Sequence, residues 1–415
     1  MPIGIGFDDA TLDTVENSGA VVFGNETIVQ RSLSEVLSDV NAREARKNAR
    51  FRNPEYVRRL NECSQFLIAV KRGEVSSHIL QEVLSTSDFP ILFGDILDLR
   101  LLNFYSQTTP VWSQYAQRGT VADFRQTRIV ALDGMQEPLY PSKFPKPELT
   151  TVQYDNNLDE TGYTTQVQVY ERGVSYNWRM LMDRRGAFLN QIPKLLGRAA
   201  LRTESKFAVN LFMDSTGFDS TFFSNGNANL INTTNGAASN NPPLSVQGLR
   251  DALNVMSRQT DSGGDPIMVE GVTLVVPPML RLTAQEILKA SMLEIVPATS
   301  AVGTRIQTPP WVNDFSLAVE AYMSAVASAD ANKYTNWAVF ANPGANRPGM
   351  EVTFLEGYEK PSLWQKAPNT QRVGGSIDPM MGDFDDMSIH QKIMHIIGGT
   401  LLDPKAAVAS NGSGS

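Results

Sequence analysis

Apolar residues recur at helical spacing between residues 192 and 214. One face of this segment is apolar, and it is formed by Ile192, Leu195, Leu196, Ala199, Phe207 and Leu211. The basic residues lie elsewhere around the turn, at Lys194, Arg198, Arg202 and Lys206. The pattern predicts an amphipathic helix from near Pro193 to about Asp214. At about 1.5 Å per residue it is roughly 30 Å long, which makes it the spine of the fold.

A different pattern marks two segments before this helix. Val121–Leu132 and Tyr163–Val174 are rich in β-branched and aromatic residues, and the second alternates polar and apolar positions. We expect them to be partner strands of a long hairpin. The sequence between them is polar and carries Pro138, Pro141, Pro145 and Pro147. An isolated two-stranded ribbon is marginally stable in water, so this hairpin must rest on another surface.

The sequence after residue 243 predicts an α/β layer. A loop rich in Asn, Ser and Gly ends there, and Ser245 is a suitable N-cap for a helix. A second helix should run from Pro278 to Lys289. The expected strands are Val272–Val276, Phe315–Tyr322, Trp337–Ala341, Met350–Leu355 and Ser388–Ile397. We expect a turn at Gly398–Gly399 and a flexible end at Ser410–Ser415.

The N-terminal region differs from the rest of the chain in its composition and its pattern of apolar residues. Residues 1–30 are acidic and aperiodic, as in an arm that lies on another surface, and short helices are expected up to residue 85. A basic patch stands within it, formed by Arg43, Arg46, Lys47, Arg50, Arg52, Arg58 and Arg59. Against Glu44 and Glu55 these seven residues give a local net charge of +5. Such a cluster is either a solvated or docking helix face, or a contact to nucleic acid.

Composition and charge argue against a protein that binds polyanions, relies on internal disulfides, or is secreted or membrane-bound. The chain has 36 Lys and Arg against 44 Asp and Glu, a net charge of -8, so as a whole it repels polyanions. Its single cysteine, Cys63, cannot form an internal disulfide, and its apolar surroundings predict a buried thiol. The acidic N-terminus does not resemble a signal peptide, and prolines interrupt the apolar run at 267–282. We therefore expect a soluble protein with no membrane partner.

Motifs for catalysis or cofactor binding do not emerge. A spacing of five separates His390 from His395, which does not bring two ligands together on a strand or a helix. The acids Asp383, Asp385 and Asp386 lack the glycine and glutamate of a calcium loop, and a turn or capping role is expected. No nucleophile elbow or phosphate loop occurs. The sequence therefore predicts no catalytic residue, no metal site, no cofactor and no enzymatic activity.

The order of these elements resembles that of the major capsid proteins of tailed double-stranded DNA bacteriophages, notably those of actinobacterial phages. Several short sequence segments also resemble these proteins, and they occur in the same order along the chain. They are Ser87-Asp88-Phe89-Pro90 through Gly94, Val174-Ser175-Tyr176 before Asp183, Ile192-Pro193-Lys194-Leu195-Leu196-Gly197-Arg198-Ala199-Ala200, Gly248-Leu249 with Ala252-Leu253, Leu274-Val275-Val276-Pro277-Pro278, and Gly398-Gly399 with Leu402-Asp403-Pro404. The resemblance covers residues 87–410.

The resemblance implies an α+β chain with the tailed-phage major capsid fold, which encapsulins share. Its parts are an N-terminal arm with short helices (1–86), the start of a peripheral domain (87–120), an extended hairpin loop (121–174), the peripheral domain with its spine helix (175–242), an axial α/β domain (243–370), and a return to the peripheral domain with a flexible tail (371–415). Each extended loop would lie over a neighbouring copy, which supplies the support that the hairpin lacks.

The resemblance also implies a function. Copies of the chain would form hexamers and pentamers that close into an icosahedral shell around double-stranded DNA, without sequence-specific binding. Scaffold, portal and decoration proteins are further partners in such a virion, which would assemble in the cytoplasm of the bacterial host. Candidate intersubunit contacts on the loop are Tyr140, Lys143, Lys146, Tyr154 and Tyr163, and the two lysines would be the candidates for an isopeptide crosslink of the kind that some relatives form. The basic patch would face the interior.

Two alternatives stay open at this point. An encapsulin-type compartment would keep the fold and enclose an enzyme in place of DNA. A hydrolase with its site in the 243–370 unit belongs to another class, because paired carboxylates can be remote along the chain.

Overall fold

The computed structural model describes residues 108–133, 159–177, 191–260, 271–289, 315–344, 347–367 and 382–414, with shorter pieces at 22–23, 26–27, 55–56, 58–63, 94–95, 97–98, 101–102, 104–105, 264, 266–267, 293–295, 305–307, 369–370 and 373. Its strands are β1 (Val22–Phe23), β2 (Glu26–Thr27), β3 (Gln117–Val121), β4 (Thr127–Asp133), β5 (Asp159–Thr165), β6 (Val167–Asn177), β7 (Met213–Asp214), β8 (Gly217–Phe218), β9 (Val272–Val276), β10 (Leu293–Ile295), β11 (Arg305–Gln307), β12 (Phe315–Val319), β13 (Trp337–Ala341), β14 (Met350–Leu355), β15 (Ser362–Gln365), β16 (Ser388–Leu401) and β17 (Ala407–Ser410). Its helices are η1 (Val111–Gln114), α8 (Ile192–Phe212), α9 (Val246–Ser257), η3 (Pro278–Leu280), α10 (Arg281–Lys289), α11 (Met323–Val326) and η5 (Pro404–Ala406).

The chain forms two compact units, and each is made of three stretches of sequence. The first unit contains Met1–Thr109, Val169–Leu201 and Glu356–Ile396, and the second contains Pro110–Gln168, Arg202–Leu355 and Ile397–Ser415. Helices and strands are mixed throughout, which confirms the predicted α+β class. The finer division of the chain into six segments stays a prediction.

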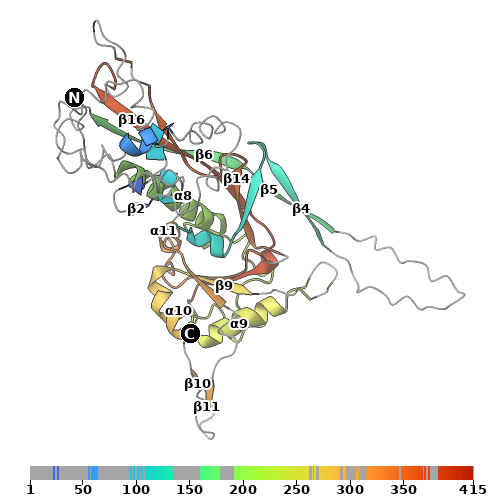
Figure 1. Cartoon of the computed structure of the whole chain (residues 1–415). Coiled ribbons are helices and arrows are strands. Elements are labelled where there is room, and N and C mark those ends of the chain that lie inside the picture. The colour runs from blue at the N-terminus through green and yellow to red at the C-terminus, as the bar shows by residue number, and fades with distance from the viewer. Residues whose placement is uncertain are drawn as a thin grey trace, which may run out of the picture. The chain divides into compact units, whose positions relative to one another are not determined.

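A four-stranded sheet lies at the centre of the second unit, in the order β12-β9-β13-β17. β12 is parallel to β9, whereas the other two pairs are antiparallel. Every residue of β9, β13 and β17 is buried, which explains why the first two are rich in apolar residues, with Thr273 as the polar exception. α9 and α10 lie beside this sheet, and Leu249 and Val255 of α9 join its core (Figure 1).

The expectation of a flexible end at Ser410–Ser415 is wrong at Ser410, which is the last residue of β17 and is buried. β17 pairs with β13 from Phe340↔Ala407 to Trp337↔Ser410, so the end of the chain completes the central sheet. The hydroxyl of Ser410 donates to the carbonyl of Pro242 over 2.8 Å. Ser410 resembled the start of a linker in composition, but a small side chain is also what a buried strand can accommodate.

A second set of strands in this unit contains β14 between β3 and the end of β16. β14 is parallel to β3 and antiparallel to β16. The expected turn at Gly398–Gly399 is wrong, because β16 runs without a break to Leu401. The two glycines serve close packing instead: a Cβ on Gly398 would lie 2.3 Å from the carbonyl oxygen of Gln166, and one on Gly399 would lie 2.6 Å from that of Glu351.

The spine helix forms as expected, but its buried face is displaced by about one residue. Of the residues placed on the apolar face, Leu196 is buried as expected, but Leu195 is 57% exposed. Ala200, which was not placed on that face, is buried. Glu204, a charged residue, continues the buried stripe in the second unit. Periodicity therefore predicted the helix correctly, but only part of its buried face.

In the first unit, β15 pairs with β16 from Ser362↔Met394 to Gln365↔Gln391. Cys63, in the helical segment at 58–63, is buried, which confirms the expected buried thiol, and burial raises the pKa of this thiol to about 12. The acids after residue 382 form a turn, as predicted. Asp383 accepts a hydrogen bond from Lys366 over 2.6 Å, and Asp386 accepts one from the backbone N–H of Ser388 over 2.9 Å.

Candidate assembly surface

A two-stranded ribbon, formed by β4 and β5, leaves the second unit (Figure 1). The strands are antiparallel and in register from Thr127↔Thr165 to Asp133↔Asp159. No other strand of the described residues pairs with either of them. The hairpin was predicted, but its second strand ends at Thr165, so the alternating run that follows belongs to β6 and not to the ribbon.

Apolar side chains of the ribbon are exposed. Val130, within β4, is 49% exposed, and Phe124, in the connection from β3, is 46% exposed. Phe124 stands beside an exposed ion pair between Asp123 and Arg125, whose hydrogen bonds lower the pKa of the aspartate. Exposed apolar groups on a ribbon without a packed face indicate a surface that is completed by another partner.

The base of the ribbon, in contrast, is packed tightly. The hydroxyl oxygens of Thr165, at the end of β5, and Thr353, in β14, lie 2.9 Å apart. Both residues are buried. The backbone of Gln166 passes directly over Gly398, and Val167 is buried next to it. The ribbon is therefore fixed where it begins, and over its length its strands pair only with each other among the described residues.

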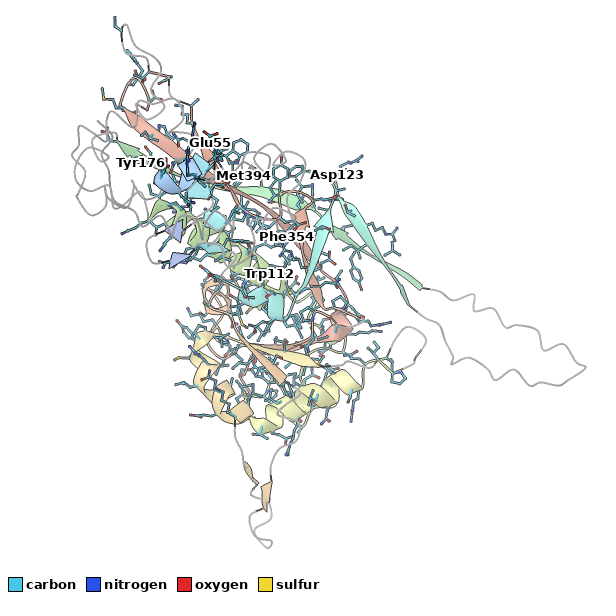
Figure 2. The ribbon with its side chains drawn as sticks, in the orientation of Figure 1. Glu55, Trp112, Asp123, Tyr176, Phe354 and Met394 are labelled. Carbon is cyan, nitrogen blue, oxygen red and sulfur yellow. The ribbon has the colours of Figure 1, made fainter. Side chains whose placement is uncertain are left out.

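Two buried glutamates of the second unit escaped the sequence analysis. Glu204 of α8 accepts a hydrogen bond from the indole N–H of Trp112 over 3.0 Å. Glu320, after β12, accepts one from the hydroxyl of Tyr115 over 3.4 Å. Figure 2 marks Trp112 within this unit. Both aromatic partners come from the region of η1, far away in sequence, so no local motif signals them. Because both glutamates are almost completely buried, they act as internal polar contacts and not as an accessible acid-base pair.

The described residues contain no group of three or more His, Cys, Asp or Glu that could hold a metal ion. His390 and His395, weighed in the sequence as ligands, have separate surroundings. Nε2 of His390 lies 2.9 Å from the hydroxyl oxygen of Ser388, and the ring of His395 packs edge-on against that of Tyr105. Within the same described part of the chain, no helix has the length and apolar character needed to cross a membrane.

A profile of the phage capsid protein family matches residues 161–410. This match spans more than half of the chain, from β5 to β17. The chain belongs to the phage capsid protein family. It is therefore a structural subunit of a phage capsid, as its sequence predicted. As a capsid protein it is part of the virion. No curated protein matches it.

Solved structures similar to this capsid protein come from phages and from a virus-like particle. A chain of Gordonia phage Cozz is 13% identical, with 71% of this chain and 83% of that chain covered and a TM-score of 0.41. A chain of Mycobacterium phage Bobi is 12% identical, with 72% and 89% covered and a TM-score of 0.42. The virus-like particle from Pyrococcus furiosus gives 10% identity, 77% and 99% coverage and a TM-score of 0.37.

Of the contact residues predicted on the hairpin, one lies in the described part of the capsid protein. Tyr163 is in β5, opposite Ile129 of β4, and is half-buried. The others, Tyr140, Lys143, Lys146 and Tyr154, lie outside the described residues. The role of all five at an intersubunit contact stays a prediction.

The basic patch of the capsid protein is described only at its end. Arg58 forms an ion pair with Glu62 over 3.6 Å, and Arg59 forms one with Glu55 over 3.1 Å. These pairs have the i,i+4 spacing of an exposed helix face, which favours the solvated alternative for these two residues. Arg43, Arg46, Lys47, Arg50 and Arg52 lie outside the described residues, so the interior position of the patch remains a prediction.

Proposed function

We propose that this subunit assembles through hexamers and pentamers into a closed icosahedral shell that encloses the double-stranded DNA of a tailed phage. The β4–β5 ribbon of each copy lies over a neighbouring copy. Such heterologous contacts form closed rings and shells when their rotation closes. Assembly takes place in the cytoplasm of the host, with scaffold, portal and decoration proteins as further partners.

The observation that carries this proposal is the contrast along the ribbon. Its base is buried and hydrogen-bonded through Thr165, whereas Val130, further along β4, is half-exposed. A lone ribbon with apolar side chains on its surface gains stability when a second surface covers it. In a shell, the neighbouring copy provides that surface at every position.

The chemistry of the chain agrees with a container. A net charge of -8 disfavours tight binding of DNA phosphates, so the wall would not hold the genome against filling and release. The basic patch at 43–59 is the exception, and we place it on the inner face. The subunit has a structural role in this proposal, and the buried carboxylates of Glu204 and Glu320 accept internal hydrogen bonds.

A shortened ribbon tests the proposal. Asp133 and Asp159 stand opposite each other, so an Asn-Gly turn in place of residues 134–158 closes the ribbon at an existing pair. We expect the variant to keep the melting temperature of the unassembled subunit, and to lose closed particles in negative-stain microscopy. The wild-type protein, with a scaffold supplied where one is needed, should form closed shells of uniform diameter.

A second variant removes one exposed apolar side chain instead of the loop. The variant Val130→Thr keeps the shape and the β-propensity of the side chain, and should lower the yield of shells without preventing closure. Wild-type protein that stays a small discrete species under all assembly conditions contradicts the proposal. So does a shortened ribbon that assembles as well as the wild type.

A further inference from the structure

The two threonines at the ribbon base form an unusual buried contact. Thr165 is 2% exposed and Thr353 is fully buried, and 188 residues separate them in the sequence. Their hydroxyl groups are 2.9 Å apart, and each can donate or accept. A buried hydroxyl group without a hydrogen-bond partner costs about 1 to 3 kcal/mol. The two side chains therefore favour the arrangement in which their hydroxyl groups face each other.

The side chain of Thr353 is held from a second side. On β3, Gly119 stands opposite Thr353, and a Cβ on this glycine would lie 3.1 Å from the Thr353 methyl carbon. The methyl group therefore lies over Gly119 while the hydroxyl group points toward Thr165. A β-branched side chain has few rotamers, so contacts on both sides fix its direction.

The chain that leaves the ribbon is fixed as well. A Cβ on Gly398 would lie 2.3 Å from the carbonyl oxygen and 2.7 Å from the carbonyl carbon of Gln166, so only glycine permits this approach. The side-chain amide of Gln166 then donates a hydrogen bond over 3.1 Å to the carbonyl of Phe124, before β4 begins. The chain entering β4 and the chain leaving β5 are thus linked to each other at the base of the ribbon.

We propose that this base, formed by Thr165, Gln166, Thr353 and Gly398, is a positioning site that sets the direction in which the ribbon leaves its subunit. The inference rests on the proposed function. A small change of angle at the base displaces the far end of the ribbon by a larger distance. At about 3.3 Å per residue, the seven residues of β4 extend over about 23 Å. A tilt of about 10° at the base moves the far end by about 4 Å, which is a whole side-chain contact distance. The base therefore determines whether neighbouring copies meet in the geometry of one shell size.

The double variant Thr165→Val/Thr353→Val separates positioning from folding. It removes both hydroxyl groups together, so neither is left buried without a partner, and it keeps the shape of both side chains. We expect the unassembled subunit to melt within about 2 °C of the wild type. The fraction of particles with the wild-type diameter should fall at least twofold, with open or variable shells in their place.

Two further variants complete the set. Thr353→Ser keeps the hydroxyl group but removes the methyl group that lies over Gly119, so it should disturb shell diameter less than the double variant does. Gly398→Ala inserts a Cβ against the Gln166 carbonyl and should disturb shell diameter at least as much as the double variant. Its control is Gly344→Ala, where a Cβ meets nothing within 4 Å.

Hydrogen exchange provides a test that does not depend on assembly. In unassembled subunits of the double variant, the peptide spanning residues 165–168 should exchange at least tenfold faster, while exchange in β9 and β13 stays unchanged. A double variant that is stable, exchanges normally at 165–168 and yields uniform shells of wild-type diameter overturns the positioning site. Wild-type protein that never forms shells refutes the proposed function itself, and this result is visible before any variant is compared.

Discussion

The hydroxyl group of Tyr115 donates a hydrogen bond to the carboxylate of Glu320 over 3.4 Å, although 205 residues separate the two. Both side chains are buried, and the ring of Tyr115 packs against those of Phe212 and Phe340. Burial raises the pKa of Glu320 to about 7, against the lowering effect of hydrogen bonds from the backbone of Tyr322 and from Tyr115. The core of this subunit therefore contains a carboxyl group that titrates near neutral pH.

The variant Glu320→Gln should make the stability of the subunit less dependent on pH. The folded pKa of about 7 is above the usual glutamate value of 4.5, so the folded state binds the proton more tightly than the unfolded state. The stability from this group is fully present below about pH 4.5, and it is lost as the pH rises through 7. The difference corresponds to roughly 3 kcal/mol, which the neutral glutamine does not lose.

Thermal unfolding of unassembled subunits at pH 5 and pH 8 measures this effect. The melting temperature of Glu320→Gln relative to the wild type should be higher at pH 8 than at pH 5. Glu286→Gln is the matched control, because Glu286 is exposed on α10 and its replacement should shift both values equally. Equal effects of Glu320→Gln at the two pH values contradict the prediction.

Loss of the cap of α9 should weaken the second unit. The hydroxyl oxygen of Ser245 accepts a hydrogen bond from the backbone N–H of Gly248 over 3.0 Å. Ser245→Ala should lower the free energy of unfolding by about 1 kcal/mol in a denaturant titration, and Ser245→Asp should restore it. Ser257→Ala, at the other end of the helix, caps no N–H group and should change little. An effect of Ser257→Ala as large as that of Ser245→Ala argues against the cap.

The elements that the sequence predicted correctly are those whose structural cause lies nearby in the chain. The runs Trp337–Ala341 and Met350–Leu355 predicted β13 and β14 to the residue, because strands that are largely buried on both faces are rich in apolar residues. Ser245 predicted the start of α9 because an N-cap bonds within three residues. In these cases the physical cause lies within a few positions of its effect.

Signals with a distant cause were missed or misinterpreted. The glycine pair at 398–399 resembles a turn, yet it is required by the backbones of Gln166 and Glu351, which only the folded chain brings close. The partner of Glu320 is equally remote. For the candidate assembly surface, the need for support was predictable from the length and polarity of the hairpin. The Thr165–Thr353 contact at its base was not, because nothing in either local sequence indicates the other.

The thiol of Cys63 should be inert in the folded subunit. It is buried, and burial raises its pKa to about 12, so the reactive thiolate is scarce at pH 8. We expect modification by a disulfide reagent to be at least a hundredfold slower in native protein than in protein unfolded in guanidinium. A native rate equal to that of a free cysteine peptide shows instead that the thiol is accessible.

Val408 provides a direct test of the C-terminal strand. It is fully buried in the core of the central sheet and pairs with Val339. Val408→Ala removes two methyl groups from this core, so it should lower the free energy of unfolding by about 2 to 3 kcal/mol. The same change at Val373, which is fully exposed, should have almost no effect. Denaturant titrations of the two variants decide the matter, because a Val408 side chain outside the packed core would make both substitutions equally neutral.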